Sequence, residues 1–123
     1  MKLDHYQKRL LVGWEDVFKR GLLTYWVLLS LVEQPRYAAE IMQFIEIQSG
    51  GNFAVEEQSL YRALRRYVDS ELVVYSSQQT SNGADRKYYE LTTTGRKVLA
   101  VFIKQNISPL HNELTTKILT EGN

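Results

Sequence analysis

The spacing of apolar residues changes once along this chain, and that change limits the fold more than any other feature. Up to about Ser70, apolar residues recur with the 3.6-residue period of amphipathic helices. Two short runs rich in Val, Tyr and Leu follow at 72–78 and 86–91, and their composition is typical of strands. Asn82-Gly83 lies between them and is the strongest short signal for a hairpin turn. The sequence therefore predicts a helical unit followed by a β-hairpin with a polar tip.

The helical part divides at glycine and proline. The helices predicted before the hairpin span residues 4–20, 22–33, 37–48 and 57–70. Gly21, Pro35 and the stretch 49–52 separate them, because these residues favour helix ends and turns. After the hairpin, Thr92 is a candidate N-cap for a further helix, and Ser108-Pro109 marks the predicted start of a last one.

Composition places the chain among ordinary globular proteins. Its 123 residues suit a single domain, with 44% hydrophobic and 24% charged residues. There is no cysteine, so no disulfide is expected, and no apolar run approaches the about 20 residues of a membrane span. The N-terminus lacks the pattern of a signal peptide, so a cytoplasmic location is expected. A formal net charge of only +1 means that any binding of nucleic acid depends on local charge.

The segment "SLYRALRRYV", Ser59 to Val68, gathers positive charge on one side of a predicted helix. At 100° per residue, the apolar arc contains Leu60, Ala63, Leu64, Tyr67 and Val68. The opposite arc contains Gln58, Tyr61, Arg62 and Arg65, with Arg66 at the rim. Arg, Gln and Tyr can donate hydrogen bonds to phosphates and base edges. A solvated charged face is the alternative interpretation of this helix.

The order of elements favours a mainly α (α+β) fold, a winged helix-turn-helix core with a two-stranded wing. In that architecture helix 57–70 is the one that enters the major groove. The wing carries Arg86-Lys87 at the start of its second strand, which suits contact with backbone phosphates. The candidate DNA-binding residues are therefore Gln58, Ser59, Tyr61, Arg62, Arg65, Arg66, Arg86 and Lys87.

Four motifs resemble the PadR family of bacterial transcriptional regulators. They are "LLSLVEQPRYAAEI" from Leu28, "SLYRALRRY" from Ser59, "SELVVY" from Ser70 and "GADRKYYELTTTGRKVL" from Gly83. The resemblance implies a dimeric winged-helix protein that binds a palindromic DNA operator, most often as a repressor, and that in some members responds to a small aromatic ligand. It also implies one domain over 1–123, with an N-terminal helix (1–21), a winged-helix core (22–92) and C-terminal dimerisation helices (93–123).

The sequence departs from the family pattern in an extra helix expected before the core, in a short C-terminal part and at two further positions. Glu56-Glu57 stands where the family often has Ser-Pro at the start of the recognition helix. Two carboxylates suit the helix dipole there but repel phosphate. Ala39 replaces an aromatic residue that is common in the second core helix. A winged-helix module that binds a protein and not DNA is therefore the rival hypothesis.

Apolar residues near both ends favour a homodimer. One stripe contains Leu3, Tyr6, Leu10 and Trp14, and a second face contains Val98, Leu99, Phe102 and Ile103. Trp14, Trp26 and Phe102 are candidate contacts for a small aromatic effector, although an aromatic on an apolar helix face is more often part of the core. His5 and His111 have no partners at metal-ligand spacing, and no catalytic cluster is visible. Neither enzyme activity nor a cofactor is expected.

Overall fold

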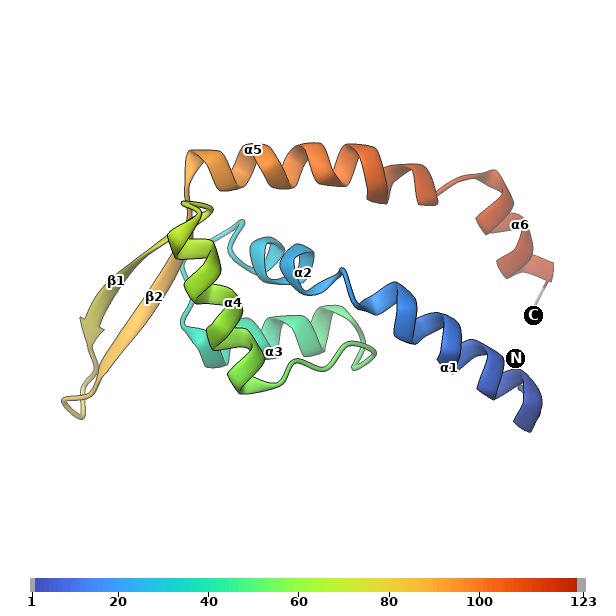
Figure 1. Ribbon diagram of the computed structural model, residues 1–123, viewed down its shortest axis with the longest axis horizontal. Helices are drawn as coiled ribbons and strands as arrows, with labels where there is room; N and C mark the ends of the chain where they lie inside the picture. The colour runs from blue at the N-terminus through green and yellow to red at the C-terminus, as the bar shows by residue number, and fades with distance from the viewer. Residues whose placement is uncertain (1, 122–123) are drawn as a thin grey trace.

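The computed structural model describes residues 2–121, and in this range the chain forms six α-helices and one two-stranded antiparallel sheet (Figure 1). The elements are α1 (His5–Lys19), α2 (Leu23–Ser30), α3 (Ala38–Gln48), α4 (Glu57–Asp69), β1 (Val73–Gln79), β2 (Asp85–Leu91), α5 (Thr93–Phe102) and α6 (Glu113–Glu121). Residues 1, 122 and 123, the ends of the expected terminal segments, lie outside the described range.

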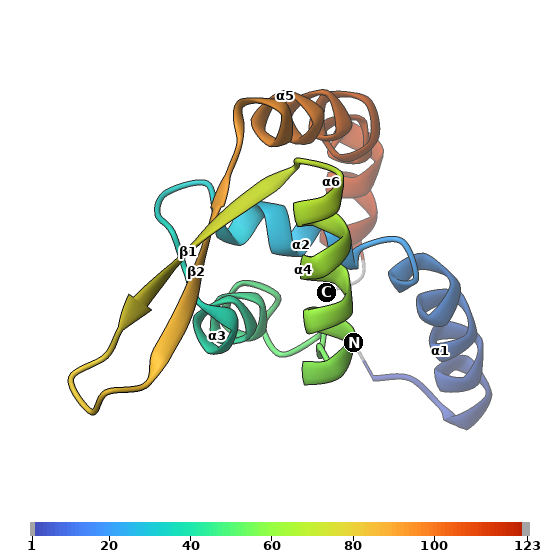
Figure 2. The same ribbon diagram turned by 60° about the vertical axis from the view of Figure 1, so that its left-hand side comes forward.

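Helices α2, α3 and α4 pack around one core, and the hairpin projects from its side. α5 crosses the top of this core, while α1 and α6 extend from the end opposite the hairpin (Figures 1 and 2). The fully buried side chains come from the three helices and the root of the hairpin: Val27, Leu28, Leu31, Ile41, Ile45, Leu60, Leu64 and Val73. The predicted winged helix-turn-helix core is confirmed.

The wing is joined to the helical core by backbone hydrogen bonds. β1 and β2 pair from Val73↔Leu91 to Gln79↔Asp85. An isolated antiparallel bridge then connects β2 to Arg36, whose N–H donates to the Tyr89 carbonyl at 3.1 Å and whose carbonyl accepts from the Tyr89 N–H at 2.8 Å. The turn after α2 is thereby fixed against the wing.

The second helix ends at Ser30, earlier than the predicted residue 33. Arg36 pairs with β2, so the chain must leave the helix several residues before Pro35. The Arg36 Nε also donates to the Ser30 carbonyl at 2.7 Å and satisfies one of the free acceptors at the helix end.

The junction between the wing and α5 is closely packed. Thr92 is the N-cap of α5, as predicted, because its Oγ1 accepts from the Gly95 N–H at 2.9 Å. The Thr92 N–H donates to the Leu72 carbonyl at 3.1 Å, which links the end of β2 to the residue before β1. A Cβ atom placed on Gly95 would lie 2.1 Å from the Leu72 carbonyl oxygen. Only glycine therefore allows α5 to approach the root of the wing this closely.

The predicted start of the last helix at Ser108-Pro109 is wrong. After α5 the chain continues as a π-helical stretch (Ile103–Ile107) and a 3-10 turn (Ser108–Leu110), and the Ser108 side chain caps neither. Asn112 takes the capping role, because its Oδ1 accepts from the Leu114 N–H at 2.9 Å and from the Thr115 N–H at 3.2 Å. α6 therefore starts only at Glu113.

The first and last helices, α1 and α6, bury no side chain within this chain. Trp14 is 76% exposed and Leu114 is 74% exposed. The predicted apolar face of α5 is divided, because Leu99 belongs to the core, Phe102 and Ile103 are half-buried, and Val98 stays exposed. None of the described helices combines the length and apolar character needed to cross a membrane.

We expect Gly95→Ala to lower the free energy of unfolding by at least about 2 kcal/mol, because its methyl group overlaps a backbone oxygen that cannot move alone. Urea denaturation checks this. Gly13→Ala is the matched control, since a Cβ there meets nothing within 4 Å and alanine favours the α1 helix. Equal stability of the two variants would contradict the close approach at Gly95.

Candidate nucleic-acid interface

The two faces of α4 are separated as the sequence predicted. Leu60, Ala63, Leu64 and Tyr67 are buried. The exposed side carries Gln58, Tyr61, Arg62, Arg65 and Arg66, whereas Ser59 is half-buried. The Tyr67 and Thr24 hydroxyls are 2.7 Å apart, so a hydrogen bond fixes α4 against α2. The packing of its buried side chains and this hydrogen bond therefore determine which side of α4 faces outward.

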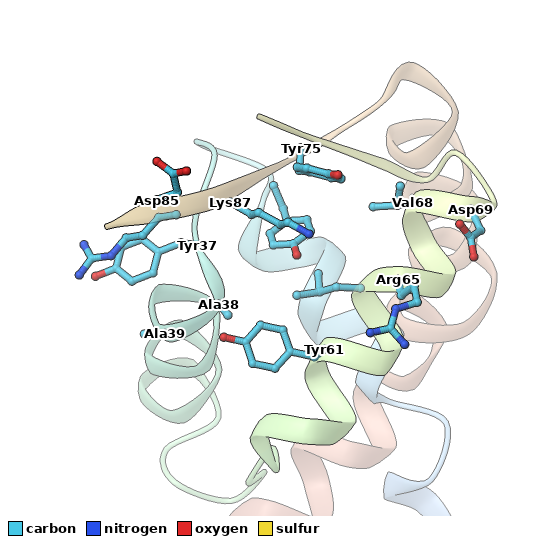
Figure 3. A pocket seen from close by; sticks show the side chains of 13 residues that line it. Tyr37, Ala38, Ala39, Tyr61, Arg65, Val68, Asp69, Tyr75, Asp85 and Lys87 are labelled. Carbon is cyan, nitrogen blue, oxygen red and sulfur yellow. The ribbon is translucent and has the colours of Figure 1, made fainter. Parts of the chain in front are cut away.

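A hollow of about 700 Å³ lies between α4, the start of α3 and the wing. Figure 3 shows Tyr61 extending from α4 toward Ala38 and Ala39, with Tyr75 and Lys87 of the wing across the hollow. Its polar and aromatic lining consists of Tyr37, Tyr61, Arg65, Asp69, Tyr75, Asp85, Arg86, Lys87 and Tyr89. The fold thus brings four predicted residues, two from α4 and two from the wing, to one concave surface.

Both wing cations lie over tyrosine rings. The Arg86 Cζ is 4.4 Å from the centroid of the Tyr37 ring, and the Lys87 Nζ is 4.7 Å from that of Tyr75. Adjacent strand residues point to opposite faces, so each cation packs on a ring on its own side of the wing. Attraction between a cation and an aromatic face stabilises both placements.

The candidate cations are not neutralised. Within residues 2–121, ion pairs join only Glu15 to Lys19 and Lys117 to Glu121. Arg62 makes one weak side-chain contact, from its Nη2 to the Ser59 Oγ at 3.4 Å. In the described range no carboxylate lies within 4.0 Å of Arg65, Arg86 or Lys87. Asp69 and Asp85 also line the hollow, so the surface is mixed in charge, with three cations and two carboxylates that form no ion pair with them.

Several predicted residues lie outside the hollow. The hollow is not lined by Gln58, Ser59, Arg62 or Arg66. All but the half-buried Ser59 lie on the remaining exposed surface of α4. Glu56 and Glu57 are exposed at the start of this helix, also outside the hollow, and the Glu56 side chain forms no capping bond. These two glutamates therefore lie outside the concave surface that carries Tyr61 and Arg65, whereas Asp69 and Asp85 line it.

The three candidate effector residues are not brought together. Trp26 and Phe102 both contact Tyr25, with ring centroids 5.4 and 6.1 Å from its own. Trp14 is exposed on α1, and none of the three lines the hollow. Within residues 2–121 no group of three or more His, Cys, Asp or Glu side chains could hold a metal ion.

Tyr37 and Tyr75 were missed in the sequence. Tyr75 could have been predicted to contact Lys87, because the strand register places it opposite Tyr89 and diagonal to Lys87. The role of Tyr37 could not have been predicted from local sequence, since its contact with Arg86 joins residues that are distant along the chain.

Three packed helices followed by a two-stranded wing define a winged helix-turn-helix protein. Comparison with known proteins identifies the family to which it belongs. The sequence model of the transcriptional regulator PadR-like family matches residues 27–101. An uncharacterised protein of Lysinibacillus sphaericus is 31% identical over 86 residues, which cover 70% of this chain and 79% of that protein. The chain belongs to the PadR-like family, whose members are transcription regulators and not enzymes.

Solved structures share this fold. A PadR-like transcriptional regulator from Bacillus cereus is 27% identical, with a TM-score of 0.65 and coverage of 87% of this chain and 99% of that one. A PadR-like transcription factor from Bacteroides fragilis is 28% identical, with a TM-score of 0.59 and coverage of 89% and 94%. Bacillus subtilis PadR, solved in complex with operator DNA, is 18% identical, with a TM-score of 0.63 over 68% of this chain and 46% of that one.

Burial raises the pKa of Tyr89, and the neighbouring Tyr61 and Tyr75 raise it further, whereas Arg65 lowers it. The folded state therefore holds the Tyr89 proton more tightly than the unfolded state. We expect this contribution to stability to be complete below about pH 10 and to disappear as the pH rises above that value. Urea denaturation between pH 9 and 11 checks this. Tyr89→Phe should weaken the pH dependence, whereas Tyr6→Phe on exposed α1 should leave it unchanged.

Proposed function

We propose that this protein is a homodimeric, sequence-specific DNA-binding regulator that acts in the cytoplasm on a palindromic operator. The observation that carries the proposal is the hollow between α4 and the wing, where Arg65, Arg86 and Lys87 have no carboxylate partner within ion-pair distance. A double helix bound there would meet the exposed face of one helix and the cations of one hairpin together. The chain would act as one unit, with the winged-helix core binding DNA and the terminal helices forming the dimer.

α4 is the element proposed to enter the major groove. Tyr61, Arg62 and Arg65 face outward and suit base edges, and the exposed Arg66 would lie nearer the phosphate backbone. Gln58 and Ser59, at the start of the helix, and Arg86 and Lys87, in the wing, complete the proposed contacts. The operator complex of Bacillus subtilis PadR supports this use of the fold, since that protein binds DNA with the same architecture.

The exposed apolar residues of the terminal helices support a dimer. The exposed large side chains of α1 and α6 include Tyr6, Leu10, Trp14, Val17, Phe18, Leu114, Ile118 and Leu119. Apolar surface of this extent in a soluble protein usually marks an interface. A two-fold dimer through these helices would space two copies of α4 for a palindromic site.

Repression, and its relief by a small aromatic effector, are the remaining parts of the proposal. Repression is what the resemblance to the family implies, and the half-buried Trp26 and Phe102, which both contact Tyr25, provide aromatic surface for an effector. The rival function, a protein-binding module without DNA binding, is favoured by the exposed pair Glu56-Glu57.

We expect Arg65→Ala to weaken binding to a DNA fragment selected by the wild-type protein by roughly 1–3 kcal/mol and to relax specificity at one base pair. The fold should be spared, with a change in unfolding free energy within about 0.5 kcal/mol. Arg86→Ala and Lys87→Ala should instead weaken binding to all sequences and reduce the salt dependence of binding, because phosphate contacts release counterions. Fluorescence anisotropy over a range of salt concentrations measures both effects.

Lys97→Ala is the charge-matched control, because Lys97 is exposed on α5 and does not line the hollow. Wild-type protein that binds no DNA from a random pool at low salt would overturn the proposal and favour the protein-binding module. Unchanged affinity of Arg65→Ala beside failure of the wing variants would show that α4 does not read bases.

We expect the wild-type protein to be a dimer at micromolar concentration and Leu10→Lys to be monomeric, since a buried lysine without a partner opposes association. Light scattering after size exclusion measures the mass. Ile47→Lys is the control, because Ile47 is 66% exposed but lies on α3, outside the terminal helices. A monomeric wild-type protein, or dissociation by Ile47→Lys and not by Leu10→Lys, would contradict the proposed interface.

A further inference from the structure

Arg86 lies in a small cluster that joins the wing to the start of α3. Its guanidinium carbon is 4.4 Å from the centroid of the Tyr37 ring. Tyr88, two residues further along β2, meets the same ring edge-on, with centroids 5.4 Å apart and an interplanar angle of 71°. Tyr37 therefore contacts two neighbouring side chains on this face of the strand, Arg86 and Tyr88.

The backbone at Tyr37 is fixed by α3 on one side and by a bridge to β2 on the other. Tyr37 is the N-cap residue of α3, and its N–H donates to the Glu40 carboxylate at 3.2 Å. The preceding residue, Arg36, is held to Tyr89 by the two backbone hydrogen bonds of the bridge. The Tyr37 ring is thus a fixed platform at the edge of the hollow.

Arg86 needs such a platform because of its place in the hairpin. Its partner in the register is Gln78, next to the last pair of the ladder, Gln79↔Asp85. Both strands are exposed here, and within the described residues no carboxylate pairs with Arg86. Without the ring, the long side chain would sample many rotamers, and binding would have to restrict them.

We propose that Tyr37 is a positioning residue for DNA binding, which holds the Arg86 guanidinium so that its edge is free to bind a backbone phosphate. Stacking occupies the flat face of a guanidinium, whereas its five N–H donors lie in the plane. The ring therefore orders the side chain and leaves its hydrogen-bonding capacity available. This inference rests on the proposed function and deepens it, because Tyr37 itself need not touch the DNA.

The test compares wild-type protein with Tyr37→Phe, Tyr37→Leu, Arg86→Ala and the double variant Tyr37→Leu/Arg86→Ala, on a fragment selected by the wild-type protein. Tyr37→Leu should weaken affinity about two- to fivefold, the equivalent of one exposed cation–π contact. Tyr37→Phe keeps the ring and should bind as wild type. The double variant should bind within about twofold of Arg86→Ala, since a positioning residue has no effect once the positioned group is gone.

Salt dependence provides a measurement that a change in stability alone would not alter. Arg86→Ala should lower the slope of log affinity against log salt by about 0.9 for each phosphate that Arg86 neutralises. Tyr37→Leu should keep the wild-type slope, because Arg86 still reaches the phosphate when bound. Lys97→Ala controls for a general change of charge.

The outcomes separate this inference from the proposed function. Failure of wild-type protein to bind any DNA refutes the proposed function and the inference together. If wild type binds and Arg86→Ala weakens binding, but Tyr37→Leu has no effect or reduces affinity equally with and without Arg86, the inference alone is overturned. Normal affinity of Arg86→Ala also overturns it, since there would be no phosphate contact to position.

Discussion

The position of the wing depends on one close approach at its root. The Leu72 carbonyl accepts from the Thr92 N–H, and α5 can start beside it only because Gly95 has no side chain. The Arg36–Tyr89 bridge then fixes the middle of the hairpin to the helical core. These backbone contacts set the angle at which the wing faces α4, so the hollow between them exists before any partner binds.

A nearly neutral protein can still present concentrated charge. The net charge of +1 results from 15 basic and 14 acidic residues, yet the cations of the hollow lack carboxylate partners at ion-pair distance in the described structure. Arg86 and Lys87 instead lie over tyrosine rings, although Asp69 and Asp85 also line the hollow. A ring stabilises a cation without cancelling its charge, which suits the proposed contact with phosphate.

Local patterns in the sequence predicted the fold well, and tertiary contacts explain the misses. The faces of α4 and the strands of the wing follow from the period of apolar residues, which neighbouring residues determine. The end of α2 was predicted too late because Arg36 pairs with a strand more than fifty residues away. Tyr37 could not be recognised as part of the site for the same reason, whereas the start of α6 was missed because Asn112 caps it in place of Ser108.

The exposure of the apolar side chains of α1 has a consequence for the abundance of the protein. This helix of 15 residues buries no side chain, and its contact to the rest of the chain by a side-chain hydrogen bond is from Lys19 to Asn52. Within the helix, the Asp4–Gln7 capping box, the Glu15–Lys19 ion pair and the Arg9–Tyr6 contact add to the backbone hydrogen bonds. A helix of this length is marginal in water on its own, so the proposed dimer would stabilise it by covering its apolar side chains. A chain without a partner would offer α1 to proteases, and association would protect it by mass action. Turnover would then remove unassembled copies first, so the cellular level of the protein would be linked to its own assembly.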